Sequence, residues 1–108
     1  MPTVLETQLQ QLRERLLWMG GRTEAMLERA TRALAEHDIE LAEQVIAGDD
    51  EIDALELEVE WDCMRVLARW SPEARDLRFV MVVNRMIPIL ERVADHACNL
   101  AHTALAIG

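Results

Sequence analysis

The sequence predicts an all-α protein, an antiparallel up-down-up bundle of three helices. The chain has no Tyr, one Phe, four Gly and three Pro among 108 residues, and a composition rich in Ala, Leu, Glu and Arg favours helices over strands. Apolar residues recur at steps of three and four. Start and stop signals divide the chain into three helical segments with very short connections, which makes neighbouring helices antiparallel. We expect one domain, residues 1–108.

The first predicted helix follows an apolar stripe that begins at Leu5 and ends at Ala33. Near its middle, Gly20 and Gly21 are expected to bend the helix or to let a neighbouring helix approach closely. The stripe steps by four and three residues in turn and comprises Leu5, Leu9, Leu12, Leu16, Met19, Thr23, Met26, Ala30 and Ala33.

The second and third predicted helices each begin at a recognisable cap. Asp38 is a suitable N-cap for the second helix. Ser71 is the expected N-cap of the third, which begins near Pro72 and runs close to the C-terminus. Pro88 lacks a backbone donor and is expected to kink this third helix. The apolar stripe of the second helix comprises Val45, Ile52, Leu55, Val59, Cys63, Val66 and Trp70.

Charge and composition exclude several classes of function. The net charge of −9 argues against nucleic acid and against an anionic membrane surface as a partner. No apolar stretch is long enough to span a bilayer, no secretion signal opens the chain, and Cys63 and Cys98 fit no zinc or redox spacing. We expect a cytoplasmic protein without membrane insertion. No nucleophile–base pair, phosphate loop or oxyanion turn is visible, so we do not expect an enzyme.

Two acidic strips are predicted to face each other across the second and third helices. Asp49 and Asp53 are four residues apart, as are Glu91 and Asp95, so each pair stacks on one helix face. The midpoints of the pairs lie 20 residues before and 22 residues after Ser71, which places them within ~3 Å in height across a hairpin. The strips comprise Asp49, Asp53, Glu56 and Glu60 on one helix and Asn84, Glu91, Asp95 and His102 on the other.

These strips have two interpretations. Carboxylate oxygens suit hard cations such as Mg²⁺, Mn²⁺ or iron, and a bound cation turns the repulsion within each pair into attraction. Alternatively, both strips are solvent-exposed faces that Arg78, Arg85 and Arg92 neutralise, since these arginines recur every seven residues beside the acidic strip of the third helix. Spacing alone leaves both interpretations open.

A family resemblance favours the metal site. The motifs Asp49-Asp-Glu-Ile-Asp53, Ala74-Arg-Asp-Leu-Arg78 and Glu91-Arg-Val-Ala-Asp95-His-Ala resemble the repeat of the PhoU family, regulators of bacterial phosphate uptake and signalling. The stretch "LRERLLWMGGRTEAMLERATRAL" is similar to the first helix of that family. The resemblance implies a three-helix repeat whose E/D-x-x-x-D motifs bind metal on the bundle surface. It assigns Asp49, Asp53, Glu91 and Asp95 as metal ligands for a divalent or ferric ion (iron, manganese, magnesium or zinc).

Two departures from the family pattern accompany this resemblance. Family members usually carry two repeats in tandem, whereas this chain carries one. Many read D-L-E-R-I-G-D-H in the third helix, and here Ile89 stands at the first acidic position and Ala94 at the glycine. The missing acid removes one potential ligand or supporting partner of a metal.

The resemblance also implies a regulatory role. The chain is expected to be a metal-binding adaptor that restrains phosphate-starvation signalling through contact with a sensor histidine kinase and the ATPase of the phosphate ABC transporter. One alternative is a di-metal carboxylate protein for metal storage or redox chemistry. Against it, the residue three after Glu91 is Ala94 rather than the His of di-iron bundles. A plain helical oligomerisation module is another alternative.

We further expect a homodimer. The third helix is apolar over about half its circumference, more than the ~100° stripe that a surface helix needs, and two neighbours in a three-helix bundle cannot cover that arc. A single repeat that pairs with its own copy restores a two-repeat arrangement. The arc comprises Phe79, Val82, Val83, Met86, Leu90, Val93, Ala97 and Leu100.

Overall fold

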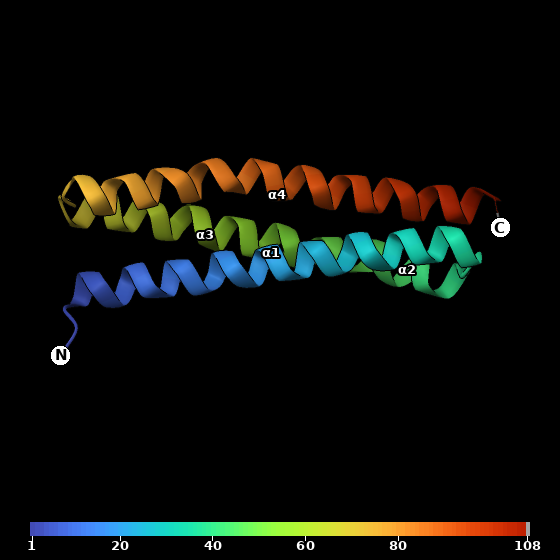
Figure 1. Cartoon of the computed structure of the whole chain (residues 1–108), viewed down its shortest axis with the longest axis horizontal. Helices are drawn as coiled ribbons and strands as arrows, with labels where there is room; N and C mark the ends of the chain where they lie inside the picture. Colours follow the sequence, from blue (N-terminus) through green and yellow to red (C-terminus); the bar gives the residue numbers. More distant parts are fainter. Residues whose placement is uncertain (108) are drawn as a thin grey trace.

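The structure, a computed structural model, describes residues 1–107 and contains four α-helices. They are α1 (Val4–Glu36), α2 (Ile39–Ala47), α3 (Asp49–Arg69) and α4 (Ala74–Ile107). Helices α2 and α3 follow each other along one descending arm, so the bundle has three arms that run up, down and up (Figure 1). Its Cα atoms span 53 × 23 × 18 Å, and residues 1–107 contain no strand. The predicted all-α three-helix architecture is confirmed.

Short caps and a tight link join the first two arms. The Thr3 hydroxyl accepts a hydrogen bond from the Glu6 amide at 3.1 Å and caps α1. His37 ends α1 in the left-handed conformation, at φ 55°, and its amide donates to the carbonyl of Ala33, which satisfies a carbonyl at the helix end. Asp38 then accepts from the Leu41 amide at 3.0 Å. Asp38 is therefore the N-cap that the sequence predicted.

The descending arm differs from the prediction, because it is broken at Gly48 into α2 and α3. Gly48 has φ −76° and ψ −12°, and its amide donates to the carbonyls of Gln44 and Val45 at 3.1 Å. The backbone thus stays close to helical at Gly48, but α2 ends there and α3 begins. Glycine is a poor helix former, and it has no side chain that could pack to stabilise a continuous helix.

The last arm begins later than predicted, at Ala74 rather than Pro72. Trp70 is extended, with φ −118° and ψ 145°, and Ser71, the residue before Pro72, is biased away from the helical conformation. The Glu73 carbonyl accepts from the Leu77 amide at 2.9 Å, so Glu73 takes the capping position that we assigned to Ser71. Helix α4 continues through Pro88.

The core consists of two clusters, one toward each end of the bundle. Arms α1 and α4 run in the same direction (Figure 1), and α1 packs more extensively against α4 than against α3. At the end near α2, small side chains let these two arms approach: Ala30, Ala33, Ala94, Ala97, Ala101 and Ala104 are all buried. The other cluster uses larger side chains: Leu12, Val59, Cys63, Val66, Val80, Val83 and Ile87.

Polar contacts also tie α3 to α1. Asp62, only 9% exposed, accepts from Arg15 at 2.5 Å and from Arg65 at 3.2 Å. The indole Nε1 of Trp70 donates to Gln8 at 2.7 Å. Helix α1 runs unbroken past its two glycines, and a Cβ added at Gly20 or Gly21 would meet nothing within 4 Å. The predicted close approach of a neighbouring helix at these glycines is therefore wrong.

Within residues 1–107, none of the helices combines the length and the apolar character that a membrane span requires.

Candidate metal centre

Helices α3 and α4 lie antiparallel and carry carboxylates along their shared groove. We call this set the acidic seam, and it comprises Asp49, Asp53, Glu56, Glu60, Glu91 and Asp95. Asp49 begins α3 directly after Gly48, and Asp53 follows one turn later. Glu91 and Asp95 lie one turn apart in the second half of α4. The four residues that the sequence predicted as ligands are all members of the acidic seam.

Asp49 faces α4 at one end of the acidic seam. Burial is the main cause that raises its pKa, and the negative charges of Asp53 and Asp95 raise it further. A hydrogen bond from the Cys98 thiol lowers the pKa of Asp49 and opposes part of that shift. Asp95 of α4 is thus close enough to influence Asp49 of α3 electrostatically, which is the juxtaposition that counting from the turn predicted.

Glu56 faces Glu91 farther along the acidic seam. Burial raises the pKa of Glu56 most, and a hydrogen bond with Glu91 and that residue's charge add to it, giving about 7. Glu56 of α3 is therefore within hydrogen-bond reach of Glu91 of α4. The sequence placed Glu56 on the acidic strip but not among the ligands. Its spacing of seven from Asp49 put it on the right face, but only the structure shows that it faces Glu91.

No arginine neutralises the acidic seam within residues 1–107. The four ion pairs of this region involve Arg15, Arg22, Arg32 and Arg65, and none of their acids belongs to the acidic seam. Arg78, Arg85 and Arg92 are exposed and form none of these pairs. Within residues 1–107, the ion pairs that the alternative interpretation called for are therefore not formed.

The donor chemistry of the acidic seam suits a hard cation. Burial and the neighbouring Asp49 raise the pKa of the Cys98 thiol to about 11, so carboxylate oxygens are the charged donors available at neutral pH, and hard cations prefer oxygen ligands. In residues 1–107, no three side chains of His, Cys, Asp or Glu converge closely enough to hold an ion as they stand. Asp53 and Asp95 are exposed. Metal ligation by Asp49, Asp53, Glu91 and Asp95 stays a prediction.

The fold and this site define a class: a three-armed helical bundle with an acidic seam on one pair of arms. The chain matches the sequence model of the PhoU domain over residues 16–104. It therefore belongs to the PhoU domain family, as the motifs in α3 and α4 had indicated.

Relatives with assigned names agree with this membership. The chain is 39% identical to a phosphate-specific transport system accessory protein PhoU homolog of Aquifex aeolicus, over 93% of this chain and 45% of the relative. It is 38% identical to the phosphate-specific transport system accessory protein PhoU of Escherichia coli, over 91% of this chain and 41% of that protein.

Solved structures show the same fold. The crystal structure of PhoU from Pseudomonas aeruginosa matches 94% of this chain with a TM-score of 0.91 at 37% identity. The phosphate transport system regulatory protein PhoU from Streptococcus pneumoniae matches with a TM-score of 0.86 at 33% identity. The match covers 48% of each of those chains. The chain spans about half the length of the PhoU proteins that it matches.

Proposed function

We propose that this chain is a metal-binding regulatory adaptor of phosphate transport and of phosphate-starvation signalling, without catalytic activity of its own and located in the cytoplasm. Family membership supports the regulatory part, since related proteins are named as accessory proteins of the phosphate-specific transport system. The observation that carries the metal part is the acidic seam, whose six carboxylates form no ion pair within residues 1–107.

Asp49, Asp53, Glu91 and Asp95 would hold the ion. When bound, a divalent or ferric ion supplies positive charge to the acidic seam and clamps α3 to α4 through their carboxylates. The protein's part is to keep these carboxylates charged and facing each other on two rigid helices. Glu56 contributes a nearby carboxyl whose pKa of about 7 links its charge to metal occupancy, because ligands and their neighbours lose protons as a cation binds.

Metal content tests this proposal directly. Protein with Asp53→Asn and Asp95→Asn should lose the metal that the parent retains after purification, as measured by elemental analysis, and should remain helical by circular dichroism. The matched control is Glu24→Gln with Glu43→Gln, two exposed acids outside the acidic seam, which makes the same change of net charge. We call the protein with Asp53→Asn and Asp95→Asn the seam variant. Equal metal content in the parent and in the seam variant would contradict the proposal.

The partners that we propose are the cytoplasmic part of a sensor histidine kinase and the ATPase of the phosphate transporter. Names of the relatives support a link to transport. A strain that lacks this chain should show unregulated phosphate-starvation genes in phosphate-rich medium, and the seam variant should fail to restore control. Normal phosphate uptake and normal starvation-gene output in the deletion strain would argue against this role.

We also propose that the chain forms a homodimer through the outward face of α4. Val82 is 52% exposed, and Phe79, Met86, Leu90 and Val93 are half-buried. Exposed apolar surface of this kind is typical of an interface. The PhoU chains of the matching crystal structures are about twice as long, so two copies of this chain would have about the size of one such protein.

Sedimentation at micromolar concentration tests the dimer. Val82→Glu should give a monomer, whereas Leu57→Glu, at an equally exposed residue of α3 (56%), should leave the assembly unchanged. Val83 is completely buried, so a charge there would unfold the bundle and cannot test the interface. A parent protein that sediments as a stable monomer would refute the dimer.

A further inference from the structure

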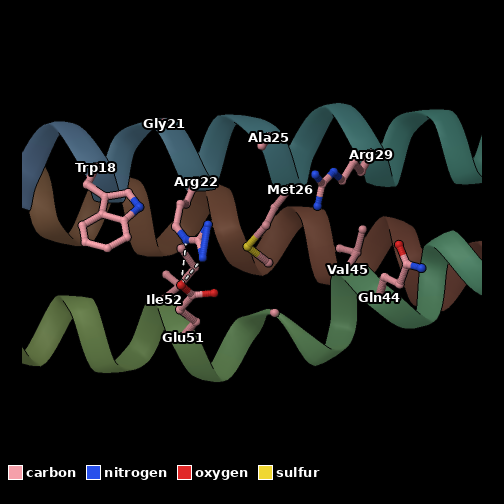
Figure 2. A pocket seen from close by; sticks show the side chains of 11 residues that line it. Trp18, Gly21, Arg22, Ala25, Met26, Arg29, Gln44, Val45, Glu51 and Ile52 are labelled. Atoms are coloured by element: carbon pink, nitrogen blue, oxygen red, sulfur yellow. Dashed lines mark hydrogen bonds and ion pairs between the residues drawn. The ribbon is translucent and has the colours of Figure 1, made fainter.

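A hollow of about 330 Å³ lies between α1 and the junction of α2 with α3 (Figure 2). None of its lining residues belongs to the acidic seam. Its floor is apolar and contains Met26, Val45 and Ile52, one residue from each of the three helices and all buried. This volume falls at the lower end of the range of small-molecule sites, which is roughly 300–1,000 Å³. The hollow can accept a ligand of modest size.

Small residues create this hollow. Gly21 of α1 lines it, and a Cβ added there would meet nothing within 4 Å. Ala25 continues the open face along α1 (Figure 2). Gly48, which separates α2 from α3, also lines the hollow. The break at Gly48, which the sequence did not predict, therefore helps to shape the hollow.

The rim places an aromatic ring at one end and a cation at the other. Trp18 is 57% exposed, and the Arg22 guanidinium lies 5.7 Å from the centroid of its ring while donating to Glu51. Arg29 is exposed and forms none of the ion pairs in residues 1–107. Figure 2 shows its guanidinium turned over the hollow, toward Met26.

The charge of the lining is opposite to that of the molecule. Two arginines and one glutamate line the hollow, whereas the whole chain carries −9. By comparison, Glu60 is the charged lining residue of a hollow between α3 and α4, and Glu6 and Glu14 line another near the N-terminus. A positive lining on a strongly acidic protein favours an anionic ligand.

We propose that this hollow binds a small anion that carries a flat ring, of the nucleoside monophosphate class. The exposed Trp18 offers a stacking surface for the ring, Arg29 offers a charge-assisted partner for the phosphate, and the amide of Gln44 is a polar contact on the opposite wall. Trp18 and Arg29 are eleven residues apart, ~16 Å along α1, and the ligand lies between their inward-turned side chains. Inorganic phosphate would leave the ring surface and apolar floor uncovered, and a neutral ring would leave Arg29 unpartnered.

Calorimetric titration with AMP, adenosine and inorganic phosphate tests the ligand class. EDTA in the buffer prevents phosphate from binding through a metal on the acidic seam. We expect one AMP per chain, and binding of adenosine and of phosphate that is each weaker by at least about tenfold, since each lacks one of the two recognition elements. No heat with millimolar AMP, or equal affinity for phosphate alone, would overturn the proposal.

Matched variants locate the binding. Arg29→Gln should weaken AMP binding at least about tenfold, while Arg32→Gln, three residues on and already paired with Glu28 at 3.5 Å, should not. Gly21→Gln should fill the hollow and abolish binding, whereas Gly20→Gln adds the same side chain at a residue that does not line it. Equal AMP affinity in the two glycine variants, with melting curves that show both folded, would contradict this location.

The proposal does not rest on the metal function. Protein with Asp53→Asn and Asp95→Asn should bind AMP like the parent, because neither residue lines the hollow. Loss of AMP binding in that variant, with Arg29→Gln unchanged, would instead place the nucleotide on the acidic seam and overturn the site proposed here.

Discussion

Helix α3 presents carboxylates to both of its neighbours, yet within residues 1–107 only those that face α1 have cationic partners. Toward α1, Asp62 receives Arg15 and Arg65, and Glu51 receives Arg22. Toward α4, the acidic seam has no such partner within residues 1–107, and Glu56 shares a hydrogen bond with another carboxyl instead. Acidic residues at similar helical spacing therefore meet two different environments: some contact arginines that tie α3 to α1, and others face further carboxylates of α4.

The two faces differ in what their charges contribute to stability. A buried carboxylate with two arginine donors is satisfied, and removing it leaves those donors without an acceptor. Carboxylates that face each other without a cation oppose folding, because their repulsion is relieved when the chain unfolds. Substitutions on the α1 side and on the α4 side of α3 should therefore change stability in opposite directions.

The largest expected effect is on the α1 side. Asp62→Asn should lower the free energy of unfolding by about 1–3 kcal/mol, because Arg15 and Arg65 lose their charged acceptor. Urea titration measures this change. Glu58→Gln, an exposed acid on the same helix, serves as the control and should stay within about 0.5 kcal/mol of the parent. Equal midpoints for parent and Asp62→Asn would show that the ion pairs of Asp62 do not stabilise the fold. The proposed difference between the two faces of α3 would then be contradicted.

A pH titration of metal-free protein tests the α4 side. The pKa of Glu56 rises from 4.5 to about 7 in the folded chain, so the native state binds more protons than the unfolded state between these values. The contribution of Glu56 to the free energy of unfolding should therefore be largest below pH 4.5, fall as the pH rises, and level off above about pH 7. Glu56→Gln, which mimics the protonated form, should remove this part of the slope. An unchanged slope between pH 4.5 and 7 would indicate that folding does not raise the pKa of Glu56.

Much of this contrast was predictable from spacing, but not all of it. Periodicity and the Asp38 cap predicted the three arms, and counting from the turn brought Asp49 near Asp95. The break at Gly48 was missed because its backbone stays close to helical and the apolar stripe continues across it. The pairing of Glu56 with Glu91, like the burial of Asp62, depends on how far each helix rotates about its axis. Spacing identifies a helix face, and side-chain packing then decides which neighbour that face meets.

The smallest expected effect has the opposite sign. In metal-free protein, Asp53→Asn should raise the free energy of unfolding by about 0.2–0.5 kcal/mol, the size of a like-charge pair at this helical spacing. Asp53 raises the pKa of both Asp49 and Glu56 through its charge, so its removal relieves repulsion on both sides. It lies beyond the first turn of α3, where little favourable interaction with the helix dipole is lost.

Replicate urea titrations with and without added Mn²⁺ make this small effect decisive. Glu51→Gln is the matched control, because it also removes one acid from α3, but an acid that Arg22 contacts. It should lower the free energy of unfolding by less than about 1 kcal/mol instead of raising it. When the parent is saturated with metal, the sign at Asp53 should reverse, since only the parent gains the stabilisation that a bound ion confers on the native state. A loss of stability at Asp53 in metal-free protein would mean that its charge is already compensated, and the two faces of α3 would then be alike.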